Sequence, residues 1–318
     1  MTDHDRTHPI RFAIQVSPEP TRIAEVGAEA EAAGFDVISV ADHVGPGGLA
    51  PIPTLAALAA TTSTIGLGTL VCNNDMRNPV QLAWEALSIH RISGGRFELG
   101  LGAGHSGHEY TETGIPFDPP ATRKARLAEA VEIIAGLVRG QPVSLDGTHY
   151  TVADAAITQN DPEEDLPPLP ILVGGNGTAL LTHAAEHADI IGLQGLGRTL
   201  EDGHRHDVRF STDHLESQLA TVAEAVPAGG RGPELNALVQ VVEITDDRER
   251  AATEVAERVP GLTVEDALST PYLAFGTVEE LATGFLAARD RWGISYFSTR
   301  SLELAPVIAR VRELDRAG

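Results

Sequence analysis

Short apolar runs rich in β-branched residues alternate with longer Ala-, Leu- and Glu-rich segments along most of the chain. The short runs are almost continuously apolar, a pattern typical of strands buried on both faces of a parallel sheet. The longer segments place apolar residues at helical spacing, as at Ile23, Val26 and Ala30. Eight strands are predicted, at 11–16, 35–41, 65–71, 96–102, 169–174, 189–193, 234–245 and 293–299. Helices are predicted at 20–33, 53–62, 80–91, 123–139, 178–187, 212–226, 248–258, from 277, and near 302–314.

This alternation predicts the fold class α/β, as a (β/α)₈ TIM barrel with insertions that spans residues 1–318 as one domain. A doubly wound sheet built from the same units is the structural alternative. Gly34 is expected to end the first helix at its C′ position. Thr122 is expected to cap the start of the fourth helix.

Three segments interrupt the rhythm of strand and helix. An insertion near 141–169 contains Val143–Val152, where Asp146-Gly147 predicts a hairpin with a type I′ turn. The acidic, proline-rich stretch 159–170 is expected to be a surface connection. Long loops are predicted near 195–211 and 260–276, and we expect these two late loops to determine which substrate is taken.

Composition narrows the classes of partner. The net charge of −22 repels nucleic acid and anionic membranes, so neither is an expected partner. No run of eighteen apolar residues is present, which excludes a membrane-spanning helix. The start of the chain has no apolar signal region, and Cys72 is the only cysteine, so we expect a cytoplasmic location.

Polar residues that follow the strands are candidates for chemistry, because the active site of such barrels lies at the carboxyl ends of the strands. Asp42 and His43 follow the second strand, and an imidazole oriented by a carboxylate suits proton transfer. A loop cap with a solvated histidine explains the pair equally well.

The segment after the third predicted strand is polar, whereas the segment after the fourth is rich in glycine. The polar residues from Thr69 to Asp75 favour turn formation, and Cys72 is expected to be inert packing. The glycine-rich stretch from Gly100 to Gly104 permits close backbone approach to a flat ring or a phosphate, but it lacks the context of a dinucleotide fingerprint. A metal site formed by His105, His108 and Glu109 is not expected, because the spacing matches no zincin pattern.

After the fifth strand, Gly174, Gly175 and Asn176 lead directly into a helix. Free backbone amides at a helix start bind anions, so this turn predicts a phosphate site. A tight turn capped by asparagine is the alternative.

Together these segments make the chain resemble the luciferase-like family of barrels, which bind FMN or coenzyme F420. The resemblance covers nearly the whole chain, and its most specific part is IGLGTLVCNND followed by RNPVQLAWEALSIHRISGGRFELGLGAG. The GGNG turn and the segment YTETGIPFDPPATRKARLAEAVE agree with it.

The resemblance implies a role for each matching position. A bulge after the third strand, often with a non-proline cis peptide, would fall at Leu70-Val71 and press against the cofactor ring. Asp42 would form a hydrogen bond near the deazaflavin, and His43 would donate or accept the proton beside the hydride-accepting carbon. The remaining implied contacts are Gly102, Ala103, Gly104 and His105 to the ring, and Gly174, Gly175 and Asn176 to the phosphate.

Two departures from the family pattern narrow the range of expected substrates. Members that oxidise sugar phosphates carry a glutamate where this chain has His105, and they bind the phosphate with lysines. Lys124 is the only lysine here, so a sugar phosphate is not the expected substrate.

The function that the resemblance implies is hydride transfer between coenzyme F420 and a small organic molecule, by a homodimer. The F420 branch is favoured by the VADH segment and the short barrel. The alternatives are an FMN-dependent monooxygenase served by a separate reductase, and a non-catalytic flavin-binding barrel. The oligoglutamate tail of F420 would need positive charge, which either of two clusters could supply: Arg198, Arg205 and Arg209, or Arg123, Lys124 and Arg126.

Overall fold

The computed structural model describes residues 8–45, 48–157, 165–199 and 206–317. Its largest sheet is a closed ring of parallel strands in the order β3-β2-β1-β15-β12-β9-β8-β5, with β3 and β5 paired to each other. An open doubly wound sheet would leave two edges unpaired, so this closure confirms the barrel. The barrel strands are β1 (Arg11–Val16), β2 (Val37–Val40), β3 (Gly66–Thr69), β5 (Phe97–Gly102), β8 (Ile171–Gly174), β9 (Ile190–Leu193), β12 (Glu234–Leu238) and β15 (Ile294–Thr299).

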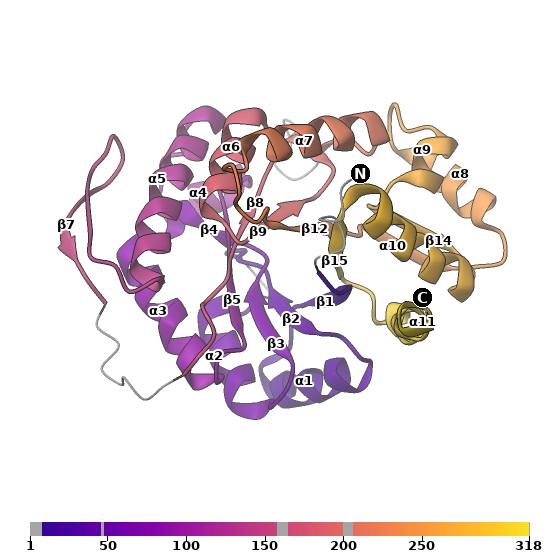
Figure 1. Ribbon diagram of the computed structural model, residues 1–318, viewed down its shortest axis with the longest axis horizontal. Helices are drawn as coiled ribbons and strands as arrows, with labels where there is room; N and C mark the ends of the chain where they lie inside the picture. Colours follow the sequence, from indigo (N-terminus) through magenta and orange to yellow (C-terminus); the bar gives the residue numbers. More distant parts are fainter. Residues whose placement is uncertain (1–7, 46–47, 158–164, 200–205, 318) are drawn as a thin grey trace.

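Helices surround this barrel (Figure 1). They are α1 (Ile23–Ala32), α2 (Pro51–Thr61), α3 (Pro79–Ile92), α4 (Gly107–Thr113), α5 (Pro120–Val138), α6 (Thr178–His187), α7 (Thr212–Ala225), α8 (Arg248–Arg258), α9 (Val264–Ser269), α10 (Val278–Trp292) and α11 (Ala305–Ala317), with short 3₁₀ turns at Pro20–Arg22, Asn74–Met76 and Leu302–Leu304. No helix in the described part of the chain is long and apolar enough to cross a membrane.

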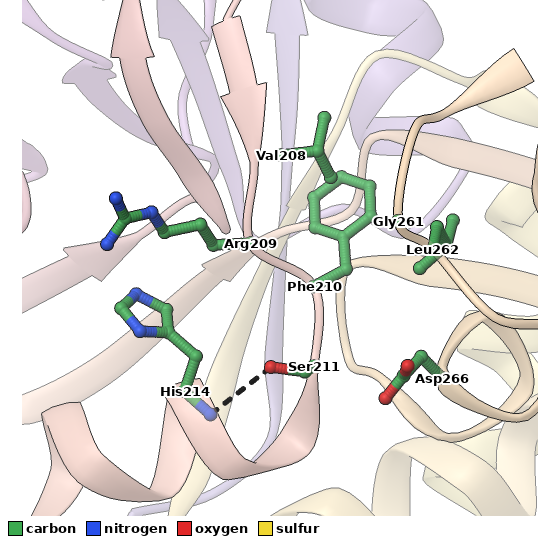
Figure 2. A pocket seen from close by; sticks show the side chains of 8 residues that line it. All are labelled: Val208, Arg209, Phe210, Ser211, His214, Gly261, Leu262 and Asp266. Atoms are coloured by element: carbon green, nitrogen blue, oxygen red, sulfur yellow. Dashed lines mark hydrogen bonds between the residues drawn. The ribbon is translucent and has the colours of Figure 1, made fainter.

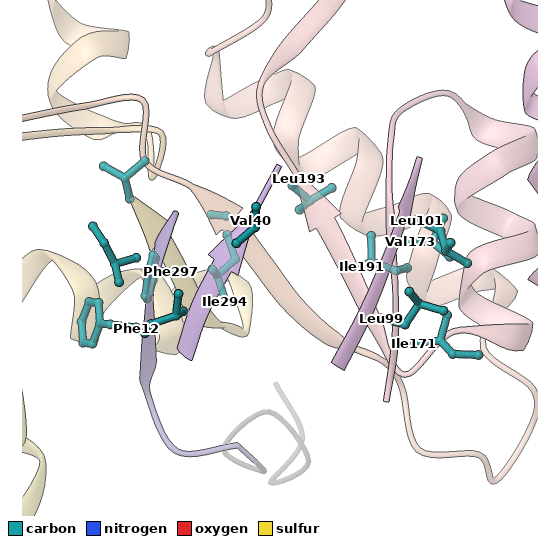
Figure 3. Packing of buried hydrophobic residues seen from close by; sticks show 14 of the residues in the cluster. Phe12, Val40, Leu99, Leu101, Ile171, Val173, Ile191, Leu193, Ile294 and Phe297 are labelled. Atoms are coloured by element: carbon teal, nitrogen blue, oxygen red, sulfur yellow. The ribbon is translucent and has the colours of Figure 1, made fainter. Parts of the chain in front are cut away.

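The period-2 alternation of the strands separates two apolar clusters. The larger cluster packs outward-facing strand residues, such as Phe12, Leu99 and Ile191, against the helices (Figure 3). The smaller cluster contains Ala13 and Ile190, which are next in sequence to Phe12 and Ile191 on the barrel strands. This second cluster fills the barrel interior, as expected for a packed barrel that is not a pore.

A buried ionic cluster lies at the amino-terminal end of the barrel. Arg11 pairs with Glu98 at 2.8 Å and with Glu234 at 2.6 Å, and Tyr296 donates a hydrogen bond to Glu98 at 2.5 Å. The guanidinium also lies 3.6 Å from the centre of the Tyr296 ring. These side chains fill the barrel at the end opposite the candidate residues.

Two predictions about helix ends have different outcomes. Gly34 follows α1 with φ of 82°, as a C′ glycine should. The predicted cap Thr122 is wrong, because α5 begins at Pro120 with Pro119 as its N-cap. Proline is favoured at the first helical position, where its missing N–H needs no partner, so the helix starts earlier.

The predicted hairpin is present, but its turn type is wrong. Strands β6 (Val143–Asp146) and β7 (Thr151–Ala155) pair antiparallel, outside the barrel beside α5 (Figure 1). Asp146 pairs with Thr151, which leaves a four-residue loop, and Gly147 lacks the positive φ that a type I′ turn requires. The carboxylate of Glu129 accepts three backbone N–H groups of this loop and holds it against α5.

The predicted strand 234–245 is two strands. The chain leaves the barrel at Gln240, whose N–H donates to the carbonyl of Tyr272, and continues as β13 (Val241–Ile244). This strand pairs with β14 (Leu273–Gly276) outside the barrel. The two late loops also contain structure: α9 and β14 in the second, and the strand pair β10 (Leu196–Thr199) and β11 (His206–Val208) in the first. The expected surface connection 159–170 lies partly outside the described residues.

Candidate active site

The residues predicted for the active site lie around the carboxyl-terminal mouth of the barrel, just past the ends of several strands. At the ends of β3, β5 and β8 the mouth is formed mainly by backbone and glycines. At the ends of β1, β2, β9, β12 and β15 it is formed by polar side chains. Because these two groups of strands are contiguous in the ring, the mouth has a glycine-rich arc and a polar arc.

The polar arc begins with His43, just beyond the end of β2. Its Nδ1 lies 2.8 Å from Oε1 of Glu109, a residue of α4. The carboxylate is 10% exposed and the imidazole 57% exposed, so the acid is held in protein while the base faces solvent. The hydrogen bond from Glu109 raises the pKa of His43 above its ordinary value, although partial burial opposes it. Glu109 therefore fixes the orientation of the imidazole, and no local sequence pattern links the two residues, which are 66 positions apart.

Asp42 is directed away from this pair. Its carboxylate accepts the backbone N–H of Asn73 at 3.0 Å and pairs with both terminal nitrogens of Arg77. The side chain is 5% exposed. These contacts support the capping alternative for Asp42, since its oxygens fix β4 (Cys72–Asn73) beside the bulge.

The bulge expected after the third strand is present. Leu67 and Gly68 of β3 pair with Phe97 and Glu98, and pairing resumes with Cys72 opposite Leu101. Three residues, 69–71, therefore face two residues of β5, and the Leu70-Val71 peptide between the two paired segments is cis.

The glycines of β5 and β8 provide the space that this bulge occupies. A Cβ at Gly102 would lie 2.6 Å from Cγ2 of Val71, and one at Gly174 would lie 3.2 Å from its Cγ1. The Val71 side chain thus packs where two neighbouring strands carry no side chain. The result is a smooth surface of backbone and valine, suited to a flat ring.

The loop after β5 is fixed by a tyrosine and an arginine. Gly104 has φ of 69°, and a Cβ there would lie 2.2 Å from the hydroxyl of Tyr110, so only glycine fits. Buried Arg123 donates to the carbonyls of Ala103 and Gly104. His105 follows with its ring 5.5 Å from that of His43, edge to face, so the residues predicted to contact the cofactor ring are neighbours of His43.

The turn after β8 has the features of an anion site. Helix α6 begins without a side-chain cap at Gly177, which leaves its first amides free of such a partner. The only lysine, Lys124, donates to the backbone carbonyl of Asn176 at 2.7 Å and to its Oδ1 at 3.2 Å. The Asn176 amide in turn donates to the carbonyl of Leu196. No sequence pattern links Lys124 to this turn, because 52 positions separate it from Asn176.

Four further side chains of the polar arc were missed. Gln15 lies near the end of β1, Gln194 and Gln240 follow β9 and β12, and Arg300 follows β15. Arg300 donates to Gln15 at 2.7 Å and to Gln240 at 3.1 Å. The signal available in the sequence was their position at a strand end, the same criterion that selected His43.

The arginine clusters suggested for the oligoglutamate tail are largely occupied. Arg123 and Lys124 bind backbone carbonyls, and Arg126 pairs with Asp75 and Asp118. Arg209 lies 3.5 Å from Asp207. The side chain of Arg198 and all of Arg205 lie outside the described part of the chain.

The two late loops meet at a pocket of about 280 Å³ (Figure 2). Its lining residues are Val208, Arg209, Phe210, Ser211 and His214 from the first loop and α7, and Gly261, Leu262 and Asp266 from the second. In the described residues no group of three or more His, Cys, Asp or Glu side chains is placed to hold a metal ion.

Comparison with known proteins agrees with this architecture. Residues 5–300 match the model of the luciferase-like monooxygenase family. The F420-dependent glucose-6-phosphate dehydrogenase of Nakamurella multipartita is 33% identical over 255 residues, which cover 76% of this chain and 70% of that protein. The enzyme of the same name from Microbacterium testaceum is 35% identical over 193 residues, 58% of this chain and 56% of the relative.

Solved structures with the same fold are more distant in sequence. The coenzyme F420-dependent tetrahydromethanopterin reductase from Methanopyrus kandleri superposes with a TM-score of 0.71 at 18% identity, covering 95% of this chain and 97% of that one. An F420-dependent secondary alcohol dehydrogenase in complex with an F420-acetone adduct gives 0.70 at 17% identity, with the same coverage. The match of the family model over residues 5–300 shows that this chain belongs to the luciferase-like monooxygenase family.

Proposed function

We propose that this chain is an oxidoreductase that transfers hydride between coenzyme F420 and a small organic substrate, with His43 as the group that moves the proton. The observation that carries the proposal is the His43–Glu109 pair beside the glycine-rich arc. Relatives at about a third identity are named F420-dependent dehydrogenases, which supports the choice of cofactor.

The chemistry of His43 follows from its partner. The carboxylate of Glu109 stabilises the imidazolium and fixes the proton of Nδ1, which leaves Nε2 to face the reacting molecule. A histidine with a raised pKa holds its proton more firmly near neutral pH, so it can donate to a developing alkoxide and take the proton back in the reverse reaction. Glu109 acts through His43 and is a positioning residue.

The residues present fit a deazaflavin nucleotide. Backbone and Val71 offer a flat surface between β3, β5 and β8, where Gly102, Ala103, Gly104 and His105 would lie along the ring. The uncapped start of α6, with Gly174, Gly175 and Asn176 before it, would hold the phosphate, with Lys124 adding positive charge. When bound there, F420 supplies or accepts the hydride, and the surrounding barrel mouth keeps water from the ring.

Two titrations followed by fluorescence quenching test the cofactor choice, one with F420 and one with FMN. We expect micromolar or tighter binding of F420 and weaker binding of FMN. Tighter binding of FMN would instead favour the flavin-dependent monooxygenase, which would react rapidly with dioxygen after reduction. A chain that binds neither would contradict the proposal while leaving the barrel unaffected.

A matched pair of variants tests the role of His43. His43→Ala should keep the wild-type dissociation constant for F420 and lose most of the turnover, about 10²- to 10⁴-fold, the range for general acid–base catalysis. His187→Ala, at the end of α6 remote from the barrel mouth, should change neither quantity. Full turnover in His43→Ala would show that another group moves the proton. The homodimer expected from the family can be checked on the same preparation by light scattering.

A further inference from the structure

Arg300 is a cation at the barrel mouth, and no acidic group in the described part of the chain neutralises it. Its Nε donates to Oε1 of Gln15 at 2.7 Å, and its Nη1 donates to Oε1 of Gln240 at 3.1 Å. Both acceptors are neutral amides. In contrast Arg77, another arginine beside the mouth, pairs with Asp42. Among the described residues, no carboxylate forms an ion pair with Arg300, so its charge is available to a ligand.

The surroundings hold the guanidinium in one orientation. The amide nitrogen of Gln15 donates to the carbonyl of Leu70 at 2.6 Å, and that of Gln240 donates to the carbonyl of Gln194 at 3.3 Å. With their nitrogens occupied in this way, both glutamines turn their oxygens toward Arg300. No described residue accepts a hydrogen bond from Nη2, and Nη1 uses only one of its two hydrogens, so donors remain on the Nη1–Nη2 edge of the guanidinium.

The guanidinium of Arg300 lies close to two parts of the proposed site, the bulge after β3 and His43. Gln15 bonds to the carbonyl of the bulge, and the charge of Arg300 acts on His43, where it lowers the pKa of the imidazole against the larger effect of Glu109. Strands β2, β1 and β15 are adjacent in the ring, so His43, Gln15 and Arg300 follow one another along the polar arc. Desolvation by the surrounding protein lowers the pKa of Arg300, and no acidic neighbour among the described residues offsets it, although the side chain remains exposed to solvent.

We propose that Arg300 binds a carboxylate of the substrate, so that the substrate is a small carbonyl or alcohol compound bearing one carboxylate, held with its reacting oxygen toward His43. The planar edge of an arginine matches a carboxylate with two parallel hydrogen bonds. A single guanidinium balances one negative charge, whereas a phosphate monoester carries nearly two. This inference rests on the proposed function for its placement of His43, but the anion site itself is independent of the cofactor.

Isothermal titration calorimetry tests the site with defined probes: pyruvate, 4-oxopentanoate, their methyl esters and glucose 6-phosphate. The titrations use the full chain, with and without saturating F420. Arg300→Gln removes the charge, and Arg300→Lys keeps the charge but not the planar edge. Arg310→Gln is the matched control, because that arginine pairs with Glu279 on an exposed helix face.

The expected result is binding of at least one oxo acid by the wild type and by Arg310→Gln. Arg300→Gln should weaken that binding about tenfold or more, as expected for loss of hydrogen bonds to a charged group, and Arg300→Lys should lie between. The methyl esters should bind weakly and equally to all four proteins. Circular dichroism melting of each variant confirms that a lost signal reflects the site and not unfolding.

Three outcomes would overturn the inference. The first is that the wild type binds no oxo acid at about 10 mM, a concentration above the weakest dissociation constant of interest. The second is equal binding of the oxo acid by Arg300→Gln and the wild type, and the third is tighter binding of glucose 6-phosphate than of any carboxylate. Failure of the proposed function is distinguishable from these. It would appear as absent F420 binding in a protein that still binds the oxo acid through Arg300.

Discussion

Gly100 should be the glycine of the barrel mouth least tolerant of substitution. A Cβ at this position would lie 2.0 Å from the carbonyl oxygen of Thr69. The Thr69 side chain cannot yield either, because its hydroxyl both accepts the N–H of Gly100 and donates to its carbonyl, each at 2.8 Å. The contact is with backbone on the strand that carries the bulge, so no flexible side-chain end can move away.

The size of the effect of Gly100→Ala follows from this contact. Real Cβ atoms essentially never approach another heavy atom within 3.0 Å, so the two strands must separate by about 1 Å. Overpacking of a well-packed core costs roughly 1–3 kcal/mol, and a backbone contact belongs at the upper end. For 318 residues the unfolding entropy is roughly 0.7 kcal/mol per kelvin. The melting temperature should therefore fall by about 3–4 °C.

The assay is thermal melting followed by circular dichroism, with F420 titrations on the same samples. Gly100→Ala should also weaken F420 binding, because separating β3 from β5 moves Leu70 and Val71, which form the proposed ring surface. Gly284→Ala is the control of opposite sign. That glycine is exposed in the middle of α10, and a Cβ added there would meet no heavy atom within 4 Å, so alanine should stabilise by about 0.5–1 kcal/mol.

A melting temperature of Gly100→Ala within about 1 °C of the wild type would contradict this prediction, because it is well short of the expected fall. That result would mean that β3 and β5 adjust without cost, and the close approach of the two strands would not define the mouth. A lower melting temperature with unchanged F420 binding would support the packing argument and contradict only the position proposed for the ring.

Three further predictions concern titratable groups. Glu109→Gln should lower the pKa of His43, because the hydrogen bond to that carboxylate is the largest influence raising it. The pair stabilises the fold most below the ordinary histidine pKa, and its contribution is lost as the pH rises through the raised value. NMR titration of the imidazole measures this, and an unchanged pKa would contradict the pairing. Asp42→Asn should lower the free energy of unfolding in urea by about 1–3 kcal/mol, since Arg77 and the backbone N–H of Asn73 lose the buried carboxylate that accepts their hydrogen bonds. The exposed Asp207→Asn should change it by no more than about 0.5 kcal/mol. Burial raises the pKa of Cys72 to about 12, so iodoacetamide at about pH 8 should label the thiol only after denaturation. Labelling of the native protein would show that β4 opens.

Local sequence determined the elements of this protein. The first strand and the helices at Thr178–His187 and Arg248–Arg258 have the predicted bounds, because apolar periodicity and helix-terminal residues act over a few positions. The mouth residues were found by the same local criterion, their place just after a strand. Only one error was local, the start of α5, which depends on a proline. The hairpin turn depends on Glu129, 20 positions from His149, and the break in the strand predicted at 234–245 depends on pairing with β14.

Only the tertiary structure decided which of these residues act together. His43 and Glu109 are 66 positions apart, and Arg300 and Gln15 are 285 apart. No periodicity or motif links them, because closure of the barrel places the last strand beside the first and brings every strand end to one rim. The amino-acid sequence thus determined which side chains reach that rim, and the geometry of closure determined which of them are neighbours, since register and curvature are properties of the whole ring of strands.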